Sequence, residues 1–409
     1  MEPSEKTFHI IFYDSKKGNY LLPLTYTRPV SEIRIGLLTI REKWMTEMKG
    51  NYCYHTSALL SSKFPVKWNR TSLIINSCYL PDSDIISKIK TLKENEALYD
   101  HEDCIAALIK ADNIENPVLE DVISSCVKIQ LVPGQTKISK IQRPWEILSI
   151  LQSEILLDFN RLTKNKKSTA LSESNRIIGN SPVFAEEGVK AECCIFNTTQ
   201  GPVYLGKGSE VMEGSMIRGP FLLGEGSTVN MGAKIYGPTA IGPKCKVGGE
   251  IKGTQFFGNA NKGHDGFLGD SIIGEWCNLG ADTNSSNLKN NYLPVRVWAY
   301  PEEKFIDSGL QFCGLIMGDH SKSGINTMFN TGTVVGAYSN IFGEGYPRTF
   351  IPSFVWGGAQ GFQTHPVKKA LETAEIVMKR RGIELSEEDT KLAEKIFQES
   401  KKFRTWEKE

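Results

Sequence analysis

Four polar residues between positions 250 and 290 have types and spacing suited to catalysis on a small polar substrate. His264 is a candidate general base, because an unperturbed imidazole titrates near neutral pH. Lys252 offers a fixed positive charge for a phosphate group, and Asn278 and Asn287 offer amide donors and acceptors. An acyl-transfer site needs such a set: a base for the nucleophile, donors for the oxyanion and polar groups for the acceptor. For His264 taken alone, a solvated turn residue remains an alternative.

The elements that must position these residues follow a period of six. From residue 183 to residue 341, aliphatic side chains recur every six residues among glycine, proline and small residues. The unbroken part of the run comprises Leu205, Val211, Ile217, Leu223, Val229, Ile235, Ile241 and Val247. We extend the same step to Val183, Val189, Ile195, Phe267, Ile273, Leu279, Met317, Ser323, Phe329, Val335 and Ile341. A chain that turns a corner after each short strand has this period, so we predict a parallel β-helix with these residues inside.

Two interruptions of the repeat flank the candidate residues. They cover residues 249–266 and 285–313. Insertions in solenoids are commonly loops on the binding face. We therefore expect both segments to be loops beside the active site.

The remainder of the chain predicts an α/β domain before the repeat and helices after it. Strands are expected at 7–13 and 72–80, with helices at 31–48 (Ser31 as N-cap), 84–92 and 145–162. Their alternation favours a parallel sheet. A helix following Pro366 and another capped by Ser386 and Asp389 are expected at the end. The predicted domains are 1–165, 176–362 and 363–409.

Composition limits the class of partner. Lys and Arg total 48 and Asp and Glu total 47, which argues against nucleic acid or an anionic membrane as the partner. There is no signal-peptide pattern and no long apolar run, so we expect a cytoplasmic protein outside the membrane. The nine cysteines form no CxxC pair, and no metal ligands are expected in the repeat. A zinc carbonic anhydrase needs three histidines, whereas only His264 and His320 lie there.

The segments EIK (250–252), HDGFLGD (264–270), NLGA (278–281) and Asn287 together resemble one enzyme family. They are similar to the acetyltransferase half of the bifunctional N-acetylglucosamine-1-phosphate uridylyltransferase/glucosamine-1-phosphate acetyltransferases. The resemblance implies a left-handed β-helix that forms a homotrimer and uses acetyl-CoA. A divergent branch of sugar nucleotidyltransferase-like proteins is the best match.

The resemblance also implies roles for individual residues. His264 would be the general base, Lys252 would hold the sugar phosphate, and Asn278 would contact the sugar. Asn287 would lie near the acceptor amine and Ala281 near acetyl-CoA. The family has tyrosine where this chain has Phe267, so a hydroxyl donor to the phosphate is lost and the acceptor is expected to differ from glucosamine 1-phosphate. His320, in MGDHSKSGI (317–325), ranks second as a base.

The stretch LLPLTYTRPVSEIRIG (21–36) resembles the signature of sugar-phosphate nucleotidyltransferases. Val30 replaces the signature lysine, and the preceding loop has only Gly18, so nucleotidyl transfer is expected to be degenerate. The candidate nucleotide-binding residues are Lys17, Arg28, Arg34 and Asn76. Mg²⁺ is a possible cofactor for this reaction, although no clear aspartate ligand is present.

These observations predict an enzyme of sugar-nucleotide biosynthesis. Its β-helix would transfer an acetyl group from acetyl-CoA to an amino sugar phosphate or a nucleotide sugar. The alternative is a non-enzymatic trimeric scaffold that binds a nucleotide sugar. Val30 replaces the lysine of the nucleotidyltransferase signature and Phe267 replaces the family's tyrosine, and both replacements favour the scaffold. The interrupted repeat around a histidine favours the enzyme.

Overall fold

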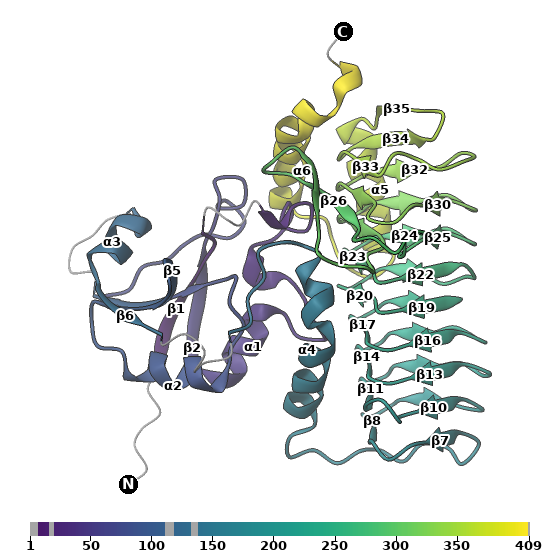
Figure 1. The fold of residues 1–409 in the computed structure, drawn as a ribbon, viewed down its shortest axis with the longest axis horizontal. Coiled ribbons are helices and arrows are strands. Elements are labelled where there is room, and N and C mark those ends of the chain that lie inside the picture. Colours follow the sequence, from purple (N-terminus) through teal and green to yellow (C-terminus); the bar gives the residue numbers. More distant parts are fainter. Residues whose placement is uncertain (1–6, 16–19, 111–117, 132–137, 408–409) are drawn as a thin grey trace. The chain divides into compact units, whose positions relative to one another are not determined.

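The computed structural model describes residues 7–15, 20–110, 118–131 and 138–407 (Figure 1). The chain forms two compact units. The first contains residues 1–18, 28–33 and 38–142, and the second contains 19–27, 34–37 and 143–409. The second unit therefore includes the long helix before the repeat, while the predicted domain limits at 165 and 362 remain predictions. Within the described ranges, no helix has the length and hydropathy needed to cross a membrane.

The first unit is an α/β domain built on one six-stranded sheet of order β2-β1-β3-β5-β4-β6. Its strands are β1 (Phe8–Tyr13), β2 (Gly50–His55), β3 (Thr71–Asn76), β4 (Glu96–Asp100), β5 (Asp103–Lys110) and β6 (Val127–Gln130). Its helices are η2 (Val30–Glu32), α1 (Ile40–Glu47), α2 (Ser83–Thr91) and α3 (Leu119–Ser125). The sheet is mixed and not wholly parallel, because β5 runs antiparallel to β3 and β4.

The helix predicted over 31–48 is shorter than expected. Helix α1 begins only after Thr39, whose hydroxyl accepts from the Glu42 backbone N–H at 3.1 Å while the Glu42 carboxylate accepts from the Thr39 N–H at 2.7 Å. This capping box starts a helix at residue 40. Gly36 has φ of +80°, a left-handed conformation that interrupts any helix begun at Ser31. The predicted helix over 84–92 is confirmed as α2.

The second unit is a parallel β-helix of the left-handed hexapeptide type, whose coils stack from β7 to β35 in Figure 1. Its first face consists of β7 (Arg176–Ile178), β10 (Ile195–Asn197), β13 (Met216–Arg218), β16 (Lys234–Tyr236), β19 (Glu250–Lys252), β22 (Phe267–Gly269), β25 (Asn284–Ser285) and β30 (Met328–Phe329). Its second face consists of β8 (Val183–Ala185), β11 (Val203–Leu205), β14 (Phe221–Leu223), β17 (Thr239–Ile241), β20 (Gln255–Phe256), β23 (Ile272–Ile273), β28 (Ile316–Met317), β31 (Val334–Val335) and β33 (Phe350–Ile351). Its third face consists of β9 (Lys190–Ala191), β12 (Glu210–Val211), β15 (Thr228–Val229), β18 (Lys246–Val247), β21 (Asn261–Lys262), β24 (Asn278–Leu279), β29 (Lys322–Ser323), β32 (Asn340–Ile341), β34 (Val355–Gly358) and β35 (Gly361–Thr364).

The six-residue repeat is confirmed, since all eight residues of the unbroken run are buried in one continuous core. At the N-terminal end of the repeat the predicted inward residues, Val183, Val189 and Ile195, were wrong. Ala185, Ala191 and Phe196 point inward there, and Ile195 is exposed. Residues 198–202 lengthen the coil before β11, which shifts the inward phase. The prediction was also wrong at Phe267, because its neighbour Leu268 fills the core.

The two interruptions of the repeat differ in structure. Residues 249–266 are not a loop, because they form a coil with short corners whose inward residues are Ile251, Phe256 and Lys262. Residues 285–313 do leave the coils and include the antiparallel hairpin β26 (Arg296–Ala299) and β27 (Lys304–Asp307).

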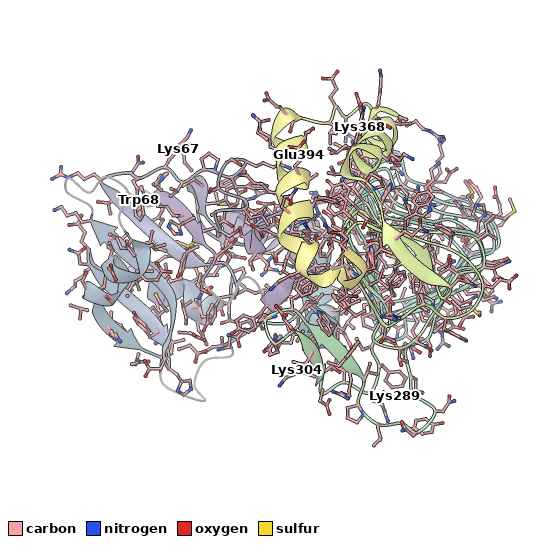
Figure 2. All side chains as sticks on the ribbon, turned by 90° about the horizontal axis from the view of Figure 1, so that it is seen from above. Lys67, Trp68, Lys289, Lys304, Lys368 and Glu394 are labelled. Carbon is pink, nitrogen blue, oxygen red and sulfur yellow. The ribbon has the colours of Figure 1, made fainter. Side chains whose placement is uncertain are left out.

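Three helices pack on the β-helix. Helix α4 (Glu146–Thr163) lies along the second face beside β14 and β17 (Figure 1). Helices α5 (Val367–Lys379) and α6 (Glu387–Glu399) pack on each other, with Lys368 and Glu394 at their outer surfaces (Figure 2). The short turns η3 (Ser400–Phe403) and η4 (Thr405–Glu407) follow. The predicted capping box of Ser386 and Asp389 is confirmed at the start of α6.

Candidate active site

His264 lies in the corner that joins β21 to β22, and its side chain is exposed to solvent. Three successive carbonyl oxygens of this corner accept hydrogen bonds from side chains. The amide of Asn230 donates to Gly263 at 2.7 Å, and the ammonium of Lys262 donates to His264 at 2.6 Å and to Asp265 at 2.8 Å. The main chain is thus fixed by two buried or half-buried donors, while the imidazole remains accessible.

Lys262 occupies an inward position that an aliphatic residue fills in neighbouring coils. Its register partner is Val247, and both side chains are fully buried. Burial lowers the pKa of Lys262 to about 8, against the opposing influence of Asp265 and Asp282. The sequence reasoning missed this residue. The six-residue step did not indicate it, because that step predicted Phe267 and not Leu268 as the next inward residue.

The His264 corner packs closely against Gly248 and Gly249 of the preceding coil. A Cβ on Gly248 would lie 2.6 Å from the Gly263 carbonyl oxygen, and one on Gly249 would lie 2.8 Å from that of His264. Gly249 also has φ of +72°. A larger residue at either position would displace the corner that presents the histidine.

A second group of predicted residues meets at the opposite end of β22. The ammonium of Lys252 lies 4.9 Å from the centre of the Phe312 ring. The Asn287 amide donates to the Asp270 carboxylate at 2.5 Å. A Cβ on Gly269 would lie 2.6 Å from Cζ of Phe267 and 2.5 Å from Nδ2 of Asn287, so the phenyl ring and the amide both rest against this glycine. We call Lys252, Phe267, Asp270 and Asn287 the acceptor cluster.

Asp270 is the acidic residue of the acceptor cluster, and Lys252 is its basic residue. Burial raises its pKa, whereas the hydrogen bond from Asn287 and the positive charge of Lys252 act in the opposite direction. Asp270 was named only as part of a motif in the sequence and not as a site residue. Its contacts show that it orients the Asn287 side chain.

Ala281 and Asn278 lie in different surroundings. The corner holding Ala281 is stacked on the His264 corner, since the Asp282 N–H donates to the Asp265 carbonyl at 3.0 Å. Asn278 lies instead on the third face, where its side-chain oxygen is 3.4 Å from the Asn261 amide nitrogen. The structure therefore brings Lys252, Phe267 and Asn287 together and places Ala281 next to His264, whereas Asn278 faces another surface.

His320, the second-ranked base, is enclosed in a column of rings. It stacks on Tyr338 with centroids 4.7 Å apart and interplanar angle 2°, and lies 6.0 Å from the ring of Trp276. Its side chain is buried. This position gives a structural role to His320 and leaves His264 as the exposed histidine of the repeat.

The nucleotide-binding candidates of the first unit are engaged within it. Asn76 donates to the Cys104 carbonyl at 2.9 Å and accepts from the Cys78 N–H at 3.1 Å. Arg28 is buried. Lys17 lies outside the described residues, and Arg34 belongs to the second unit, where it donates to the Leu37 carbonyl.

Asp14, at the carboxyl end of β1, is a polar group that the sequence reasoning did not single out. Its carboxylate accepts from Thr56 at 2.7 Å and from the Val30 N–H at 3.2 Å. Burial raises its pKa to about 6. Ligands of open α/β sheets commonly bind at such strand ends. Val30, which replaces the signature lysine, is itself buried and so presents its backbone rather than a charge to Asp14.

Among the described residues, no group of three or more His, Cys, Asp or Glu side chains could hold a metal ion. Asp14 has no second carboxylate in its hydrogen-bonding set, and both polar ends of Asn76 are already used. The described residues of the first unit therefore do not fit a magnesium site.

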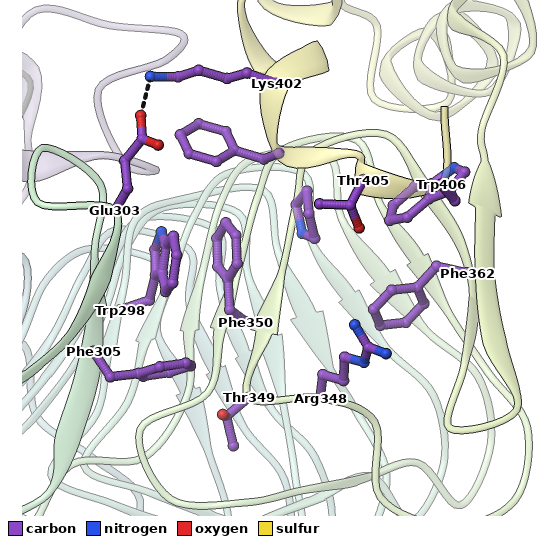
Figure 3. A pocket seen from close by; sticks show the side chains of 12 residues that line it. Trp298, Glu303, Phe305, Arg348, Thr349, Phe350, Phe362, Lys402, Thr405 and Trp406 are labelled. Atoms are coloured by element: carbon purple, nitrogen blue, oxygen red, sulfur yellow. Dashed lines mark hydrogen bonds and ion pairs between the residues drawn. The ribbon is translucent and has the colours of Figure 1, made fainter. Parts of the chain in front are cut away.

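The middle of the 285–313 insertion lines a pocket away from the acceptor cluster (Figure 3). The pocket has a volume of about 560 Å³. Trp298 and Phe350 stack there with centroids 4.1 Å apart, and Lys402 pairs with Glu303 at 2.5 Å. Only the ends of the insertion, at Asn287 and Phe312, reach the acceptor cluster.

Comparison with known proteins agrees with the two-unit architecture. Residues 10–167 match the family model described as sugar nucleotidyl transferase. The matched segment begins within β1 and ends after α4, so it contains the other five strands of the first unit's sheet and also α4.

The relatives found are bifunctional proteins. The "Bifunctional protein GlmU" of Methanococcus aeolicus is 41% identical over 90 residues, which is 22% of this chain and 21% of the relative. That of Methanocaldococcus jannaschii is 39% identical over 88 residues, with 22% and 21% covered. The chain thus spans about a fifth of these relatives' length. The "Bifunctional sugar-1-phosphate nucleotidylyltransferase/acetyltransferase" of Sulfurisphaera tokodaii is 27% identical over 276 residues, covering 67% of this chain and 61% of the relative.

A solved structure, the Arabidopsis UDP-N-acetylglucosamine acyltransferase, covers 52% of this chain and 80% of its own at 15% identity. Its TM-score of 0.23 is too low to support a conclusion.

Proposed function

We propose that this protein is an enzyme of sugar-nucleotide biosynthesis that transfers an acetyl group from acetyl-CoA to an amino sugar phosphate or a nucleotide sugar. The observation that supports this best is the exposed His264 on a corner whose carbonyl oxygens are fixed by Lys262 and Asn230. An accessible base carried on a fixed main chain suits acyl transfer, in which the base must reach the amine of the acceptor. The bifunctional relatives support the same reaction.

The proposed reaction is a direct transfer. The His264 imidazole takes a proton from the acceptor amine, whose nitrogen attacks the thioester carbonyl carbon. Backbone N–H groups near Ala281, in the corner stacked beside His264, stabilise the oxyanion. The C–S bond then breaks, the new amide remains on the sugar, and the proton passes from His264 to the leaving thiolate.

The acceptor cluster would bind the sugar phosphate. Lys252 supplies positive charge to the phosphate, and Asn287, oriented by Asp270, supplies a hydrogen-bond donor on the same side, away from the amine at the His264 corner. The His264 corner precedes β22, and the cluster lies at the end of that strand. Three residue steps of roughly 3.3 Å each separate them by about 10 Å. This separation matches an acceptor that spans both groups. Phe267 offers an apolar face where a hydroxyl is expected, so the acceptor would differ from glucosamine 1-phosphate.

The protein would act as a homotrimer in the cytoplasm. Support for association comes from the first face of the β-helix, where the outward side chains Ile195, Met216 and Tyr236 are each more than a third exposed. Exposed apolar side chains gathered on one face are typical of an interface between copies. Sedimentation analysis of the full chain tests this.

Nucleotidyl transfer by the first unit is the weaker half of the proposal. Asn76 makes internal hydrogen bonds and Val30 is buried, which favours binding of a nucleotide sugar with little or no transfer. Pyrophosphate release from a nucleoside triphosphate and sugar 1-phosphates measures this directly. If neither pyrophosphate nor thiol is released with any substrate panel, the non-enzymatic scaffold is the correct description.

The acetyl-transfer proposal is tested with the His264→Gln variant of the full chain. Thiol release from acetyl-CoA is measured with a panel of amino sugar phosphates and nucleotide sugars. Loss of a general base is expected to lower kcat by about 10²- to 10⁴-fold. The control is His101→Asn in the first unit, because the His101 side chain is 76% exposed. The backbone of residue 101 has a positive φ, which asparagine tolerates. Turnover by His264→Gln equal to that of the control would contradict the proposal.

A further inference from the structure

A second cavity lies on the third face of the β-helix, under the C-terminal end of α5. It has a volume of about 520 Å³, within the range of small-molecule sites. Strands β18, β21, β24 and β29 supply one wall, and Arg380 and Arg381 close it from the helix. We call this cavity the cationic groove.

The groove contains four cations and no carboxylate. Its charged lining residues are Lys246, Lys322, Arg380 and Arg381. In the described part of the chain none of the four forms an ion pair with a carboxylate; the polar contacts of Lys322 and Arg381 go to neutral oxygens. Like charges gathered without counter-charges repel one another and focus a positive potential in the cleft. An anion that enters the groove removes this repulsion.

Two of the cations are held in place by the protein itself. The Lys322 ammonium donates to the His320 carbonyl at 2.8 Å, and the Arg381 guanidinium donates to Oδ1 of Asn261 at 3.0 Å. Burial lowers the pKa of Lys322, and the nearby Cys277 thiol opposes this only in part. Fixed donors bind an anion at a smaller entropic cost than mobile surface lysines.

The remaining lining suits an organic ester more than a bare ion. Asn261 and Asn278 project amides into the groove, and Trp276 adds an aromatic surface. Amides hydrogen-bond to phosphate or sugar oxygens, while an aromatic surface suits a base or an acyl chain. Four cations exceed the two negative charges of a diphosphate diester, so the groove can neutralise both phosphate groups.

We propose that the cationic groove binds the diphosphate of an organic diphosphate ester. Strand β21 links it to the proposed catalytic base, because Asn261 lines the groove and His264 follows three residues later. A ligand held by its diphosphate can therefore extend toward the His264 corner. This last point rests on the proposed acetyl transfer, whereas diphosphate binding does not. Two sources share the chemistry: coenzyme A and a nucleotide sugar.

Calorimetric titration of the full chain separates these sources. The probes are coenzyme A, UDP-N-acetylglucosamine and inorganic pyrophosphate. The variants are Lys322→Met and Arg380→Ala, and the control is Lys368→Ala, which removes an exposed cation from the same helix outside the groove (Figure 2). Each groove variant is expected to raise Kd about tenfold or more for the probe that binds, with no change in the control.

The outcome for each probe has a defined meaning. Groove-dependent binding of coenzyme A identifies the acyl donor as the ligand, and groove-dependent binding of UDP-N-acetylglucosamine identifies the acceptor side. Affinity that both groove variants leave unchanged for every probe, while circular dichroism shows them folded, overturns the proposal. His264→Gln is titrated in parallel. If His264→Gln and the natural protein both bind a probe through the groove but the natural protein releases no thiol, the acetyl-transfer proposal fails and the groove proposal stands.

Discussion

Replacing Lys262 by methionine tests whether an amine inside the β-helix holds the corner that presents His264. Methionine keeps the length and flexibility of the side chain and removes its charge. The pKa of Lys262 falls from 10.5 to about 8 on folding. Because the unfolded chain binds the proton more tightly, the free energy of unfolding rises as the pH rises from about 8 towards 10.5.

The size of this effect follows from the two pKa values. The full shift corresponds to about 3 kcal/mol, at 1.36 kcal/mol for each pKa unit. Between pH 7.5 and 9.5, the linkage relation gives a gain of about 2 kcal/mol for the natural protein relative to Lys262→Met. Other lysines with equal pKa values in both states cancel in this difference.

Urea unfolding of the full chain, followed by circular dichroism at pH 7.5 and 9.5, measures the difference. Lys234→Met is the control, since Lys234 is an exposed lysine on β16 of the same β-helix. Loss of the two hydrogen bonds to the His264 and Asp265 carbonyls is also expected to lower kcat for acetyl transfer about 10- to 100-fold. Parallel pH profiles for the natural protein and Lys262→Met, together with equal kcat, would refute the reasoning.

Two further predictions concern the acceptor cluster and the first unit. Phe267→Tyr restores a hydroxyl donor on β22 and is expected to lower KM for amino sugar phosphates about tenfold, because a hydrogen bond to a charged group is worth about 1.5–3 kcal/mol. Steady-state thiol release checks this, and an unchanged KM places the phosphate elsewhere. The raised pKa of Asp14, about 6, means that the folded protein binds the proton more tightly, so its free energy of unfolding falls as the pH rises from about 4 to 6. Asp14→Asn is expected to lack this fall in urea titrations, and an equal fall in both proteins argues against a buried carboxyl.

The β-helix was predictable because its core uses one simple rule. Each inward aliphatic residue from Leu205 to Val247 lies in a strand of three or fewer residues, so the six-residue period appears directly in the sequence. The rule fails where corners change length. After Val247 the inward residues follow at steps of four, five and six, and no local pattern in the sequence announces the short corners. For that reason residues 249–266 were predicted as a loop.

The candidate site was predictable in part. The motif order led to His264, Lys252 and Asn287, of which Lys252 and Asn287 lie in the acceptor cluster and His264 lies on a separate exposed corner; their roles stay predictions. Asn278 lies on a different face from Lys252, because the two residues belong to strands separated by corners of the coil. Lys262 was missed because a lysine in a glycine-rich segment suggests solvent exposure. Only the register with Val247 places it inside the prism.

The coils below Asn230 repeat one another and contain none of the residues proposed for catalysis. Residues 205–222 form one such coil of about 4.8 Å in height, the spacing of neighbouring strands. A gene duplication or deletion of that unit would lengthen or shorten the β-helix by whole coils. Helix α4 would have to change by about three residues, at 1.5 Å each, to follow one coil. The number of coils between the start of the β-helix and the His264 corner is therefore free to vary during evolution, while the geometry of that corner stays the same.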